Sequence, residues 1–330
     1  MDEVNVINER WDYLIVLDAC RFDFFAEIYR DYLDGVLMMK KSLGTSTNEW
    51  RDNCFPGYYD DIIYISANPQ ICEKSAVYGY AAGEHFGTVH ELWKDHWDRE
   101  LGTVRPEVVT RLASEIIRAT PGKRFIIHYL QPHAPYLSLA DRTRGYFDGD
   151  VNSVRRLIGA EAGQGPGRVR KKLFQILRKA LPRGGCRGLL PKQPEWMLRK
   201  LLAIAPKAPL EAAWRTVGRQ GVRAAYAANL EAVLQQTAEL VRSLSGRIVV
   251  TSDHGEFLGE DGFYGHPTGS DHPILKEVPW LVVEGAVGTI EREGFEYGGV
   301  EGQKTPAGEP QGQEEQEELR KKLQALGYYD

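Results

Sequence analysis

Short apolar runs that end next to reactive side chains constrain the fold of this chain more than any other feature. Residues 13–17 (YLIVL) lead directly into Asp18, and residues 248–251 (IVVT) end two positions before Asp253. A strand without polar alternation is typically buried on both faces, as in a parallel sheet that is covered by helices. Further largely apolar runs are residues 62–65 (IIYI), 125–130 (FIIHYL) and 280–283 (WLVV).

Helical patterns lie between several of these runs, at residues 22–33, 106–119 and 222–244. Strands that alternate with helices predict an α/β fold with a doubly wound, mostly parallel sheet and helices on both faces. Ligands of such sheets bind outside the carboxyl ends of the strands. We therefore expect the functional site at the polar residues that follow the runs.

A strongly basic segment interrupts this alternation. The chain has a formal net charge of −5, yet residues 155–223 contain 17 Lys and Arg against three acidic residues, a net charge of +14, which leaves −19 on the remainder. A block this lopsided requires a separate explanation. We predict that residues 1–145 and 216–330 form the α/β core and that residues 146–215 form a basic helical insertion or cap.

The basic segment also indicates a partner. Residues 169–181 and 196–204 carry Leu, Phe and Trp among Lys and Arg at helical spacing, a pattern that suits contact with a membrane surface. A solvated helical cap is the simpler explanation, and an anionic glycan or lipid is a further functional alternative. Nucleic acid is disfavoured because no DNA- or RNA-binding motif accompanies the charge.

Cysteine usage indicates the compartment. The four cysteines, Cys20, Cys54, Cys72 and Cys186, form no CxxC pair, and free thiols are typical of a reducing environment. The sequence shows no apolar stretch near the roughly 20 residues that span a bilayer, and no N-terminal run that resembles a signal peptide. We expect a cytoplasmic protein that is peripheral to the membrane where the basic segment binds.

The strongest chemical signal is residues 251–256 (TSDHGE), directly after a predicted strand. A carboxylate beside an imidazole, Asp253 and His254, suits a divalent cation such as Zn²⁺ or Mn²⁺, and Gly255 lets the backbone turn sharply. Asp18 adds a third ligand from another strand. The structural alternatives are an Asp–His turn without metal and an Asp18 that caps the helix near residue 22.

A hydroxyl-rich turn, residues 44–50 (GTSTNEW), precedes a predicted helix. Ser46 and Glu49 have the spacing of a capping box, so this turn begins a helix. One hydroxyl can also be a nucleophile there, because a helix N-terminus favours an anionic substrate and a bound metal lowers a hydroxyl pKa. The turn alone does not select among the hydroxyls of Thr45, Ser46 and Thr47.

Two histidines stand in turns that contain proline, His133 in residues 131–136 (QPHAPY) and His266 in residues 264–267 (YGHP). Rigid turns of this kind suit site residues, although a histidine in a loop is often only structural. His128 lies inside an apolar run and is predicted to pack within the sheet. His272 is a reserve candidate.

Together these motifs resemble the alkaline phosphatase and sulfatase superfamily, especially its sulfatase-like branch of sulfatases, phosphonate monoester hydrolases and lipoteichoic acid synthases. The resemblance covers nearly the whole chain except the basic segment, and the DHGE element is its most specific part. It is carried by residues 17–23 (LDACRFD), the hydroxyl turn, residues 131–135 (QPHAP), 251–256 (TSDHGE), 265–267 (GHP) before 278–280 (VPW), and 323–328 (LQALGY).

The resemblance implies a metal-dependent hydrolase or transferase of phosphate, phosphodiester or phosphonate esters with a covalent intermediate. Asp18, Asp253 and His254 would hold the metal together with the nucleophile. Thr45 is the first choice as nucleophile, Thr47 is the second and Ser46 the third. His133 and His266 would contact the transferred group, protonate the leaving group or help to bind a second metal, and Arg21 would steady the anionic group or Asp18. The metal would be Mn²⁺ or Zn²⁺, with Mg²⁺ or Ca²⁺ as alternatives, and the substrate an anionic ester.

The sequence departs from the sulfatase pattern at the residue that sulfatases convert to formylglycine. Their Cys/Ser-x-Pro-x-Arg motif has its nearest match at residues 54–58 (CFPGY), where Tyr58 replaces Arg. An unmodified threonine suits a phosphorus ester better than a sulfate ester. Two alternatives stay open: a sulfatase that acts through Cys54, and a non-catalytic protein that binds an anionic ligand or a glycan.

Overall fold

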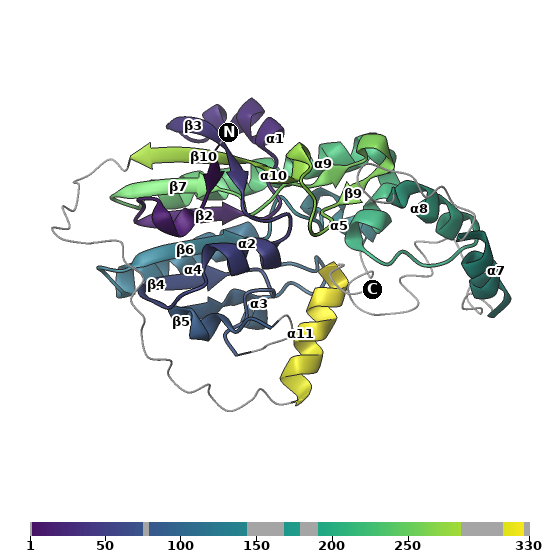
Figure 1. The fold of residues 1–330 in the computed structure, drawn as a ribbon, viewed down its shortest axis with the longest axis horizontal. Coiled ribbons are helices and arrows are strands. Elements are labelled where there is room, and N and C mark those ends of the chain that lie inside the picture. The colour runs from purple at the N-terminus through teal and green to yellow at the C-terminus, as the bar shows by residue number, and fades with distance from the viewer. Residues whose placement is uncertain (1, 75–78, 144–167, 179–190, 285–312, 327–330) are drawn as a thin grey trace.

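A single eight-stranded sheet forms the centre of the molecule (Figure 1). The computed structural model describes residues 2–74, 79–143, 168–178, 191–284 and 313–326. In chain order the strands are β1 (Glu3–Val4), β2 (Tyr13–Leu17), β3 (Val36–Ser42), β4 (Tyr59–Ser66), β5 (Phe86–Glu91), β6 (Arg124–Tyr129), β7 (Arg247–Thr251) and β10 (Glu277–Glu284), while β8 (Phe257–Leu258) and β9 (Tyr264–Gly265) form a separate hairpin.

The sheet is mixed but mostly parallel, as predicted. Its strand order is β1-β3-β10-β7-β2-β6-β4-β5, and only β10 runs antiparallel to its two neighbours. The four strands β7, β2, β6 and β4 are adjacent and parallel, so their carboxyl ends meet at one edge of the sheet. All five strands expected from the apolar runs lie in this sheet.

Strand β2 shows why these runs lack polar alternation. Ile15 and Leu17 belong to the apolar cluster on one face of the sheet, whereas Leu14 and Val16 belong to the cluster on the other face. All four side chains are fully buried. A strand at the centre of a covered sheet needs apolar side chains in both directions, and this selects a continuous run.

Helices cover both faces of the sheet. One face packs against α1 (Phe22–Ile28), α4 (Pro106–Ala119), the long helix α9 (Pro209–Val241) and the C-terminal helix α11 (Gln313–Leu326), whose buried apolar side chains share one cluster. The other face packs against α2 (Thr47–Cys54) through Trp50. Short helices are α3 (Leu92–Asp95), α5 (Ala140–Thr143) and α10 (Pro273–Lys276).

Part of the predicted insertion is described, as α7 (Arg168–Arg178) and α8 (Lys192–Leu201). Both helices extend away from the sheet at one end of the molecule (Figure 1). Helix α9 then begins within the predicted insertion, and Gly218 interrupts its helical backbone (φ 69°, ψ −175°). This kink lies next to the predicted boundary at residue 215. None of the described helices is long and apolar enough to span a lipid bilayer.

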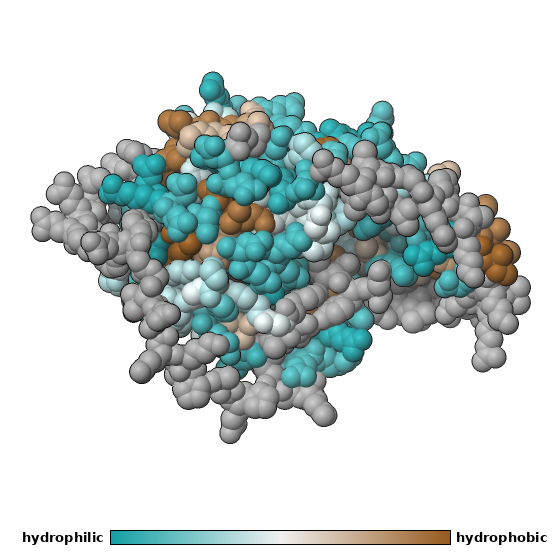
Figure 2. Space-filling model, in the orientation of Figure 1, coloured by the Kyte–Doolittle hydropathy of each residue, from teal (hydrophilic) through white to brown (hydrophobic). Residues whose placement is uncertain are grey.

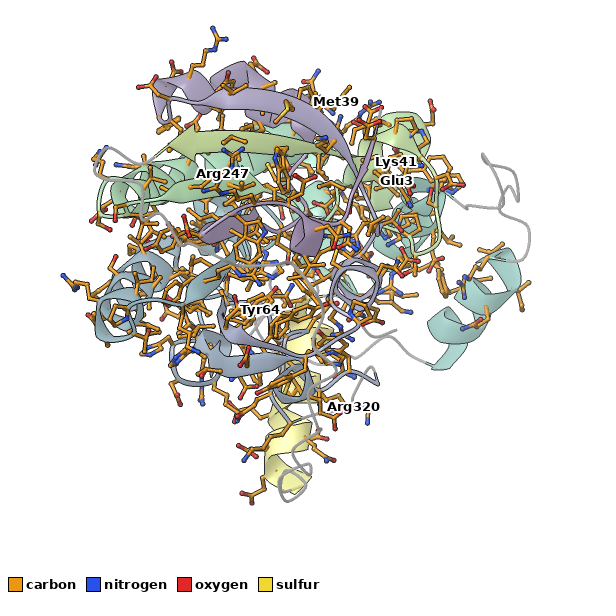
Figure 3. All side chains as sticks on the ribbon, turned by 60° about the vertical axis from the view of Figure 1, so that its left-hand side comes forward. Glu3, Met39, Lys41, Tyr64, Arg247 and Arg320 are labelled. Atoms are coloured by element: carbon orange, nitrogen blue, oxygen red, sulfur yellow. The ribbon has the colours of Figure 1, made fainter. Side chains whose placement is uncertain are left out.

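The strands missed by the sequence analysis lie toward the edges of the sheet. Side chains of β3 are largely exposed or half-buried, and the Met39 side chain and the Glu3–Lys41 ion pair (2.9 Å) lie in this part of the molecule (Figure 3). Strand β5 is also mostly exposed. Because edge strands bury few side chains, they show neither an apolar run nor strict alternation.

Gly255 is required for a different reason from the sharp turn predicted at this position. Its backbone does not adopt a positive φ; instead, its N–H donates to the Leu275 carbonyl (2.8 Å), and an added Cβ would lie 2.0 Å from the Ile274 oxygen. The segment that contains α10 therefore packs directly against residues 253–255. Only a residue without a side chain permits this contact.

We expect Gly255→Ala to lower the free energy of unfolding by about 2–3 kcal/mol, because backbone atoms must move to admit the methyl group. Urea unfolding in the presence of a chelator measures this change without a metal contribution. Gly57→Ala is the matched control, since the nearest atom to its added Cβ is 3.4 Å away. Equal stability of the two variants would contradict the tight contact.

Candidate active site and metal centre

Side chains from the carboxyl ends of four adjacent strands converge at one edge of the sheet. Asp18 follows β2, Asn68 follows β4, His133 follows β6 and Asp253 follows β7. All four are buried, although each is polar or charged. Buried polar groups need compensating partners, so this convergence indicates a binding site.

Two carboxylates and two imidazoles form the core of this site. His128 Nε2 lies 3.9 Å from both Asp18 Oδ2 and Asp253 Oδ2, while His254 Nε2 lies 3.8 Å from Asp18 Oδ1 and 3.4 Å from Asp253 Oδ2. None of these contacts is a hydrogen bond, and the spacing suits groups that share a cation. Asp18 Oδ1, His128 Nε2 and His254 Nε2 are buried atoms without a hydrogen-bond partner in the described structure.

The chain holds these groups by hydrogen bonds that leave the inner atoms available. The backbone N–H groups of Ala19 and His254 donate to Asp253 Oδ1 (3.0 and 2.9 Å), so its Oδ2 atom is left for the site. Nδ1 of His254 lies 2.9 Å from the Gly255 carbonyl oxygen. The Tyr64 hydroxyl lies 2.9 Å from Nδ1 of His128. Each imidazole therefore presents Nε2 to the carboxylates.

The structure brings Thr47, rather than Thr45, into this group. Thr47 Oγ1 donates to Asp253 Oδ2 (2.7 Å) and accepts from Asn68 Nδ2 (3.3 Å), which also donates to Asp18 Oδ2 (2.6 Å). Thr45 Oγ1 instead bonds Glu49 Oε2 (2.7 Å) and the Pro267 carbonyl (3.1 Å). Thr45 thus fixes the turn, and the hydroxyl beside the carboxylates belongs to Thr47.

The predicted helix start is confirmed. Ser46 is the N-cap of α2, and its hydroxyl accepts from the Glu49 N–H (3.4 Å). The Glu49 carboxylate reaches back to the N–H of Thr45 (2.9 Å), one residue before the cap. Thr47 is therefore the first helical residue, where unpaired backbone N–H groups and the helix dipole favour an anion.

Burial sets the protonation of the two carboxylates in the absence of a cation. Desolvation, followed by the nearby Asp253 charge, raises the pKa of Asp18 well above its ordinary value. Burial also opposes ionisation of Asp253, but His254, His128 and the Thr47 hydrogen bond outweigh it and lower its pKa. The pair therefore retains a proton that a bound cation would displace.

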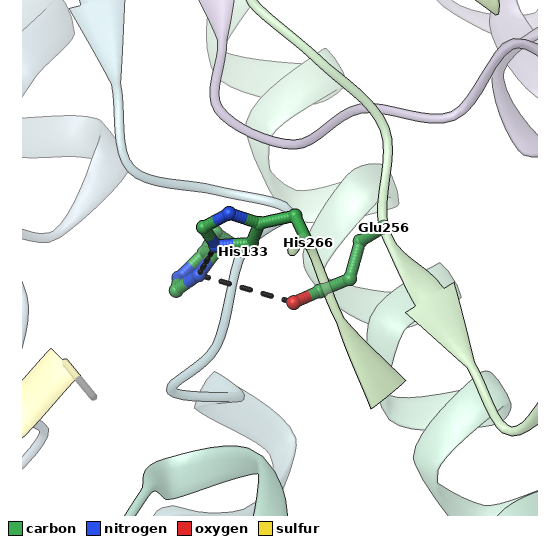
Figure 4. Close-up of side chains that lie close together, drawn as sticks. All are labelled: His133, Glu256 and His266. Atoms are coloured by element: carbon green, nitrogen blue, oxygen red, sulfur yellow. Dashed lines mark hydrogen bonds and ion pairs between the residues drawn. The ribbon is translucent and has the colours of Figure 1, made fainter. Parts of the chain in front are cut away.

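A second cluster lies next to the first. His133 Nε2 is 3.3 Å from His266 Nε2 and 3.9 Å from Glu256 Oε1 (Figure 4). The ring of His266 also lies 4.3 Å from that of His254, between centroids, so the clusters are contiguous. Burial lowers the pKa of His133 to about 4 and that of His266 well below 6.5, and it raises the pKa of Glu256 to about 8.

Each cluster has the composition of a divalent metal site. Ligand atoms of Asp18, His128 and Asp253 lie within 4.8 Å of one another, as do those of His133, Glu256 and His266. Neutral imidazoles and carboxylates are ligands for Zn²⁺ or Mn²⁺. The first cluster fits a cation better, because it contains two carboxylates and several buried atoms that nothing else in the described structure satisfies.

A cavity of about 300 Å³ opens beside the second cluster. The core contributes Gln70 and Asn48, and both oxygen and nitrogen of the buried Gln70 amide lack hydrogen-bond partners. Helix α8 contributes Lys192 and Trp196. Other lining residues are Ser46, His133, Ala134, Ala208, Pro209, Leu210, Glu256, Gly265, His266, Pro267, Thr268 and Leu326.

Arg21 and Cys54 lie outside the cluster around Asp18. The Arg21 guanidinium pairs with Asp23 and Glu260 (both 2.7 Å), so it ties the start of α1 to the β8–β9 hairpin rather than steadying Asp18. Cys54 ends α2, about 10 Å along the helix from Thr47. It packs beside Trp50 and Phe55, and burial raises its thiol pKa to about 12.

Three residues of the site were not predicted from the sequence. His128 was expected to pack within the sheet; it does so, but its Nε2 atom faces the carboxylates. Asn68 follows the run at residues 62–65 and could have been found from that position. Glu256 is part of the DHGE motif, yet only the fold brings it to His133. His272 caps α10, where its side chain accepts from the Ile274 N–H.

No protein-family model and no curated protein sequence matches the chain. Solved structures do resemble it. They include the C-terminal periplasmic domain of a phosphoethanolamine transferase from Campylobacter jejuni (13% identity, TM-score 0.41, covering 82% of this chain and 78% of that one). Another is the phosphonate monoester hydrolase of Agrobacterium radiobacter (15% identity, TM-score 0.44, covering 82% and 67%).

A third similar structure is the integral membrane lipooligosaccharide phosphoethanolamine transferase A from Neisseria meningitidis (13% identity, TM-score 0.46), of which the match covers 46% against 82% of this chain. At such low identity these likenesses concern the fold alone.

Proposed function

We propose that the chain is a metal-dependent hydrolase or transferase of phosphate, phosphodiester or phosphonate esters, with Thr47 as the nucleophile. The observation that carries this proposal is the hydrogen bond from Thr47 Oγ1 to Asp253 Oδ2 (2.7 Å), at the start of a helix and beside buried carboxylates and imidazoles. A weak nucleophile needs such activation. Thr47 thus replaces Thr45 as first choice.

Asp18, Asp253 and His254 are the proposed metal ligands together with Thr47, and His128 is an additional candidate. A bound Mn²⁺ or Zn²⁺ would lower the pKa of the Thr47 hydroxyl and attract the negative oxygens of the substrate. The Asp253 carboxylate already accepts the hydroxyl hydrogen bond and so directs the oxygen lone pairs of Thr47 away from itself. Mg²⁺ and Ca²⁺ stay alternatives because oxygen ligands suit them too.

The remaining groups have roles that follow from their positions. The N–H groups at the start of α2 would bind the oxygens of the transferred group. Thr47 Oγ1 would give its proton to Asp253 Oδ2 and attack phosphorus while the ester oxygen leaves. Glu256 keeps a proton near neutral pH, since its pKa is raised to about 8 by burial, and can donate it to the leaving oxygen. Water, or a second alcohol in a transferase, then releases the group from Thr47.

Of the alternatives, a sulfatase that uses Cys54 finds least support, because that thiol is fully buried in an apolar cluster at the far end of α2. A non-catalytic binding protein would not need a hydroxyl beside two buried carboxylates. The cytoplasmic location stays a prediction. An anionic partner for the insertion is also proposed, in the form of a glycan or a lipid surface.

We expect Thr47→Ala to lower kcat/KM for an aryl phosphorus ester by about 10³-fold or more, because the covalent step loses its nucleophile. Hydrolysis of aryl phosphate, phosphodiester, phosphonate and sulfate esters with Mn²⁺ or Zn²⁺ would measure this loss. Thr45→Ala is the matched control and should keep most of the activity. Full activity in Thr47→Ala together with loss in Thr45→Ala would restore the original choice.

The raised carboxyl pKa values predict how pH and metal act on stability. Glu256 has an ordinary pKa of 4.5 and a folded pKa of about 8, so this group is protonated in the folded chain and ionised in the unfolded chain between these pH values. The buried histidines His128, His133 and His266, whose pKa values are lowered from 6.5, act in the opposite direction below 6.5. Stability of the metal-free protein should therefore fall as pH rises from 6.5 to about 8, and the raised pKa of Asp18 acts in the same direction.

Mn²⁺ bound at Asp18 takes the place of the proton that Asp18 retains, so its stabilising effect should grow as the pH rises above 3.8, the ordinary pKa of this group. Thermal unfolding with Mn²⁺ and with chelator measures both trends. Glu256→Gln should weaken the pH dependence of the stability of the metal-free protein, yet it should keep the Mn²⁺ effect if one ion binds at Asp18. Asp18→Asn should abolish the Mn²⁺ effect. A pH-independent Mn²⁺ effect would contradict displacement of this proton.

A further inference from the structure

Exposed large apolar side chains concentrate on the two insertion helices. Of the eight such side chains in the described residues, five lie on α7 and α8, and the other three lie on β3. The insertion patch consists of Leu173, Ile176, Leu177, Met197 and Leu201. Figure 2 shows apolar atoms at the end of the molecule where Figure 1 places α7.

The patch on α7 is one face of a helix that is already packed on its other side. Leu173, Ile176 and Leu177 follow the i, i+3, i+4 spacing of a single face. Phe174 is buried instead, and the Arg199 guanidinium of α8 lies 5.8 Å from its ring centroid. An Arg178–Glu195 ion pair (3.2 Å) also joins the two helices. The exposed face is therefore not needed to attach α7 to the protein.

Helix α8 separates the patch from the proposed active site. Its buried residue Trp196 and its first residue Lys192 line the cavity, while Met197 and Leu201 point to solvent, with Leu201 82% exposed. An ammonium and an indole thus face the site on one side of α8. Two aliphatic side chains one turn apart are exposed on another side of the same helix.

The charge around the patch selects its partner. Residues 155–223 carry a net charge of +14, and two of their three acidic residues, Glu195 and Glu211, are already paired with arginines of the same segment. Exposed aliphatic side chains on a segment whose sequence has an excess of Lys and Arg match a lipid bilayer with anionic head groups. A second copy of this chain would bring like charges together, and nucleic acid offers no apolar layer for leucine.

We propose that α7 and the outer face of α8 dock on an anionic lipid bilayer. Leu173, Ile176, Leu177, Met197 and Leu201 enter the boundary between head groups and acyl chains, and the basic residues of the segment contact the head groups. The cavity then lies close to the membrane because α8 lines the cavity on one side and carries part of the patch on another. Docking itself does not depend on the proposed function. Only the idea that docking brings the active site to a membrane-bound substrate rests on that function.

The test is flotation of the full chain with phosphatidylcholine vesicles that contain or lack about 30% phosphatidylglycerol. We expect binding to the anionic vesicles that falls at about 0.5 M NaCl, because salt screens the head-group contacts. The triple variant Ile176→Ser, Leu177→Ser, Leu201→Ser should bind the anionic vesicles with an affinity that is lower by about tenfold or more. The matched control is Val36→Ser, Met38→Ser, Met39→Ser, which removes the exposed apolar patch of β3 and should bind like the wild type.

The outcomes separate this proposal from others. Absence of vesicle binding, or equal loss in both triple variants, would overturn it. Binding that depends on salt but not on the insertion triple variant would show a purely electrostatic anionic partner and would also overturn it. Thermal unfolding confirms that each variant folds. Both should hydrolyse a soluble aryl ester like the wild type, so failure of the enzymatic proposal is seen independently of membrane binding.

Discussion

The burial of two carboxylates within reach of the same imidazoles is the constraint on which the rest of the site depends. Asp18 and Asp253 are both fully buried, and each lies within 4 Å of His128 and His254. Two adjacent carboxylates cannot both ionise in a desolvated site unless a positive charge accompanies them. His128 supplies little of that charge, since burial lowers its pKa to about 4. Without a proton or a cation, two buried negative charges would raise the free energy of the folded protein. A bound divalent cation would remove this penalty, and this favours a metal centre at Asp18 and Asp253.

The parallel sheet makes this burial feasible. Carboxyl ends of β2 and β7 deliver the two carboxylates side by side, and backbone N–H groups there fix Asp253 Oδ1. Tyr226 of α9 secures the same loop from the other side, because its hydroxyl donates to the Ala19 carbonyl (2.8 Å) and accepts from the Arg21 N–H (2.8 Å). The long helix thus connects the insertion to the loop that carries Asp18. A site held by backbone and buried tyrosine contacts keeps its geometry with little reorganisation.

The sequence predicted the central strands, the α/β class, the two aspartates and His254 because burial and strand-end position leave clear patterns. It did not distinguish Thr47 from Thr45, since consecutive residues at a helix start point about 100° apart and the direction depends on the residue at which the helix begins.

The sequence predicts His128 only as a residue that packs within the sheet. On β6, Phe125, Ile127 and Tyr129 belong to one apolar cluster and Ile126 to the other. This alternation places His128 on the side of α2, where Trp50 contacts its ring, but the proximity of two carboxylates appears only in three dimensions.

Helix α8 belongs to the basic segment and also lines the cavity of the proposed active site. Lys192 lies so close to the second cluster that a Cβ added at Gly265 would be 3.3 Å from its Nζ atom. The same helix carries Leu201 into solvent. A shift of α8 upon docking would therefore move a positive charge and the Trp196 ring relative to His266 and Glu256, which makes the membrane surface and the cavity mechanically dependent on each other. Trp196 packs against Tyr264 (centroids 4.6 Å apart) in the β8–β9 hairpin, and the residue after this hairpin is His266. A displacement of α8 as a whole would therefore reach the site through this aromatic contact and through Lys192.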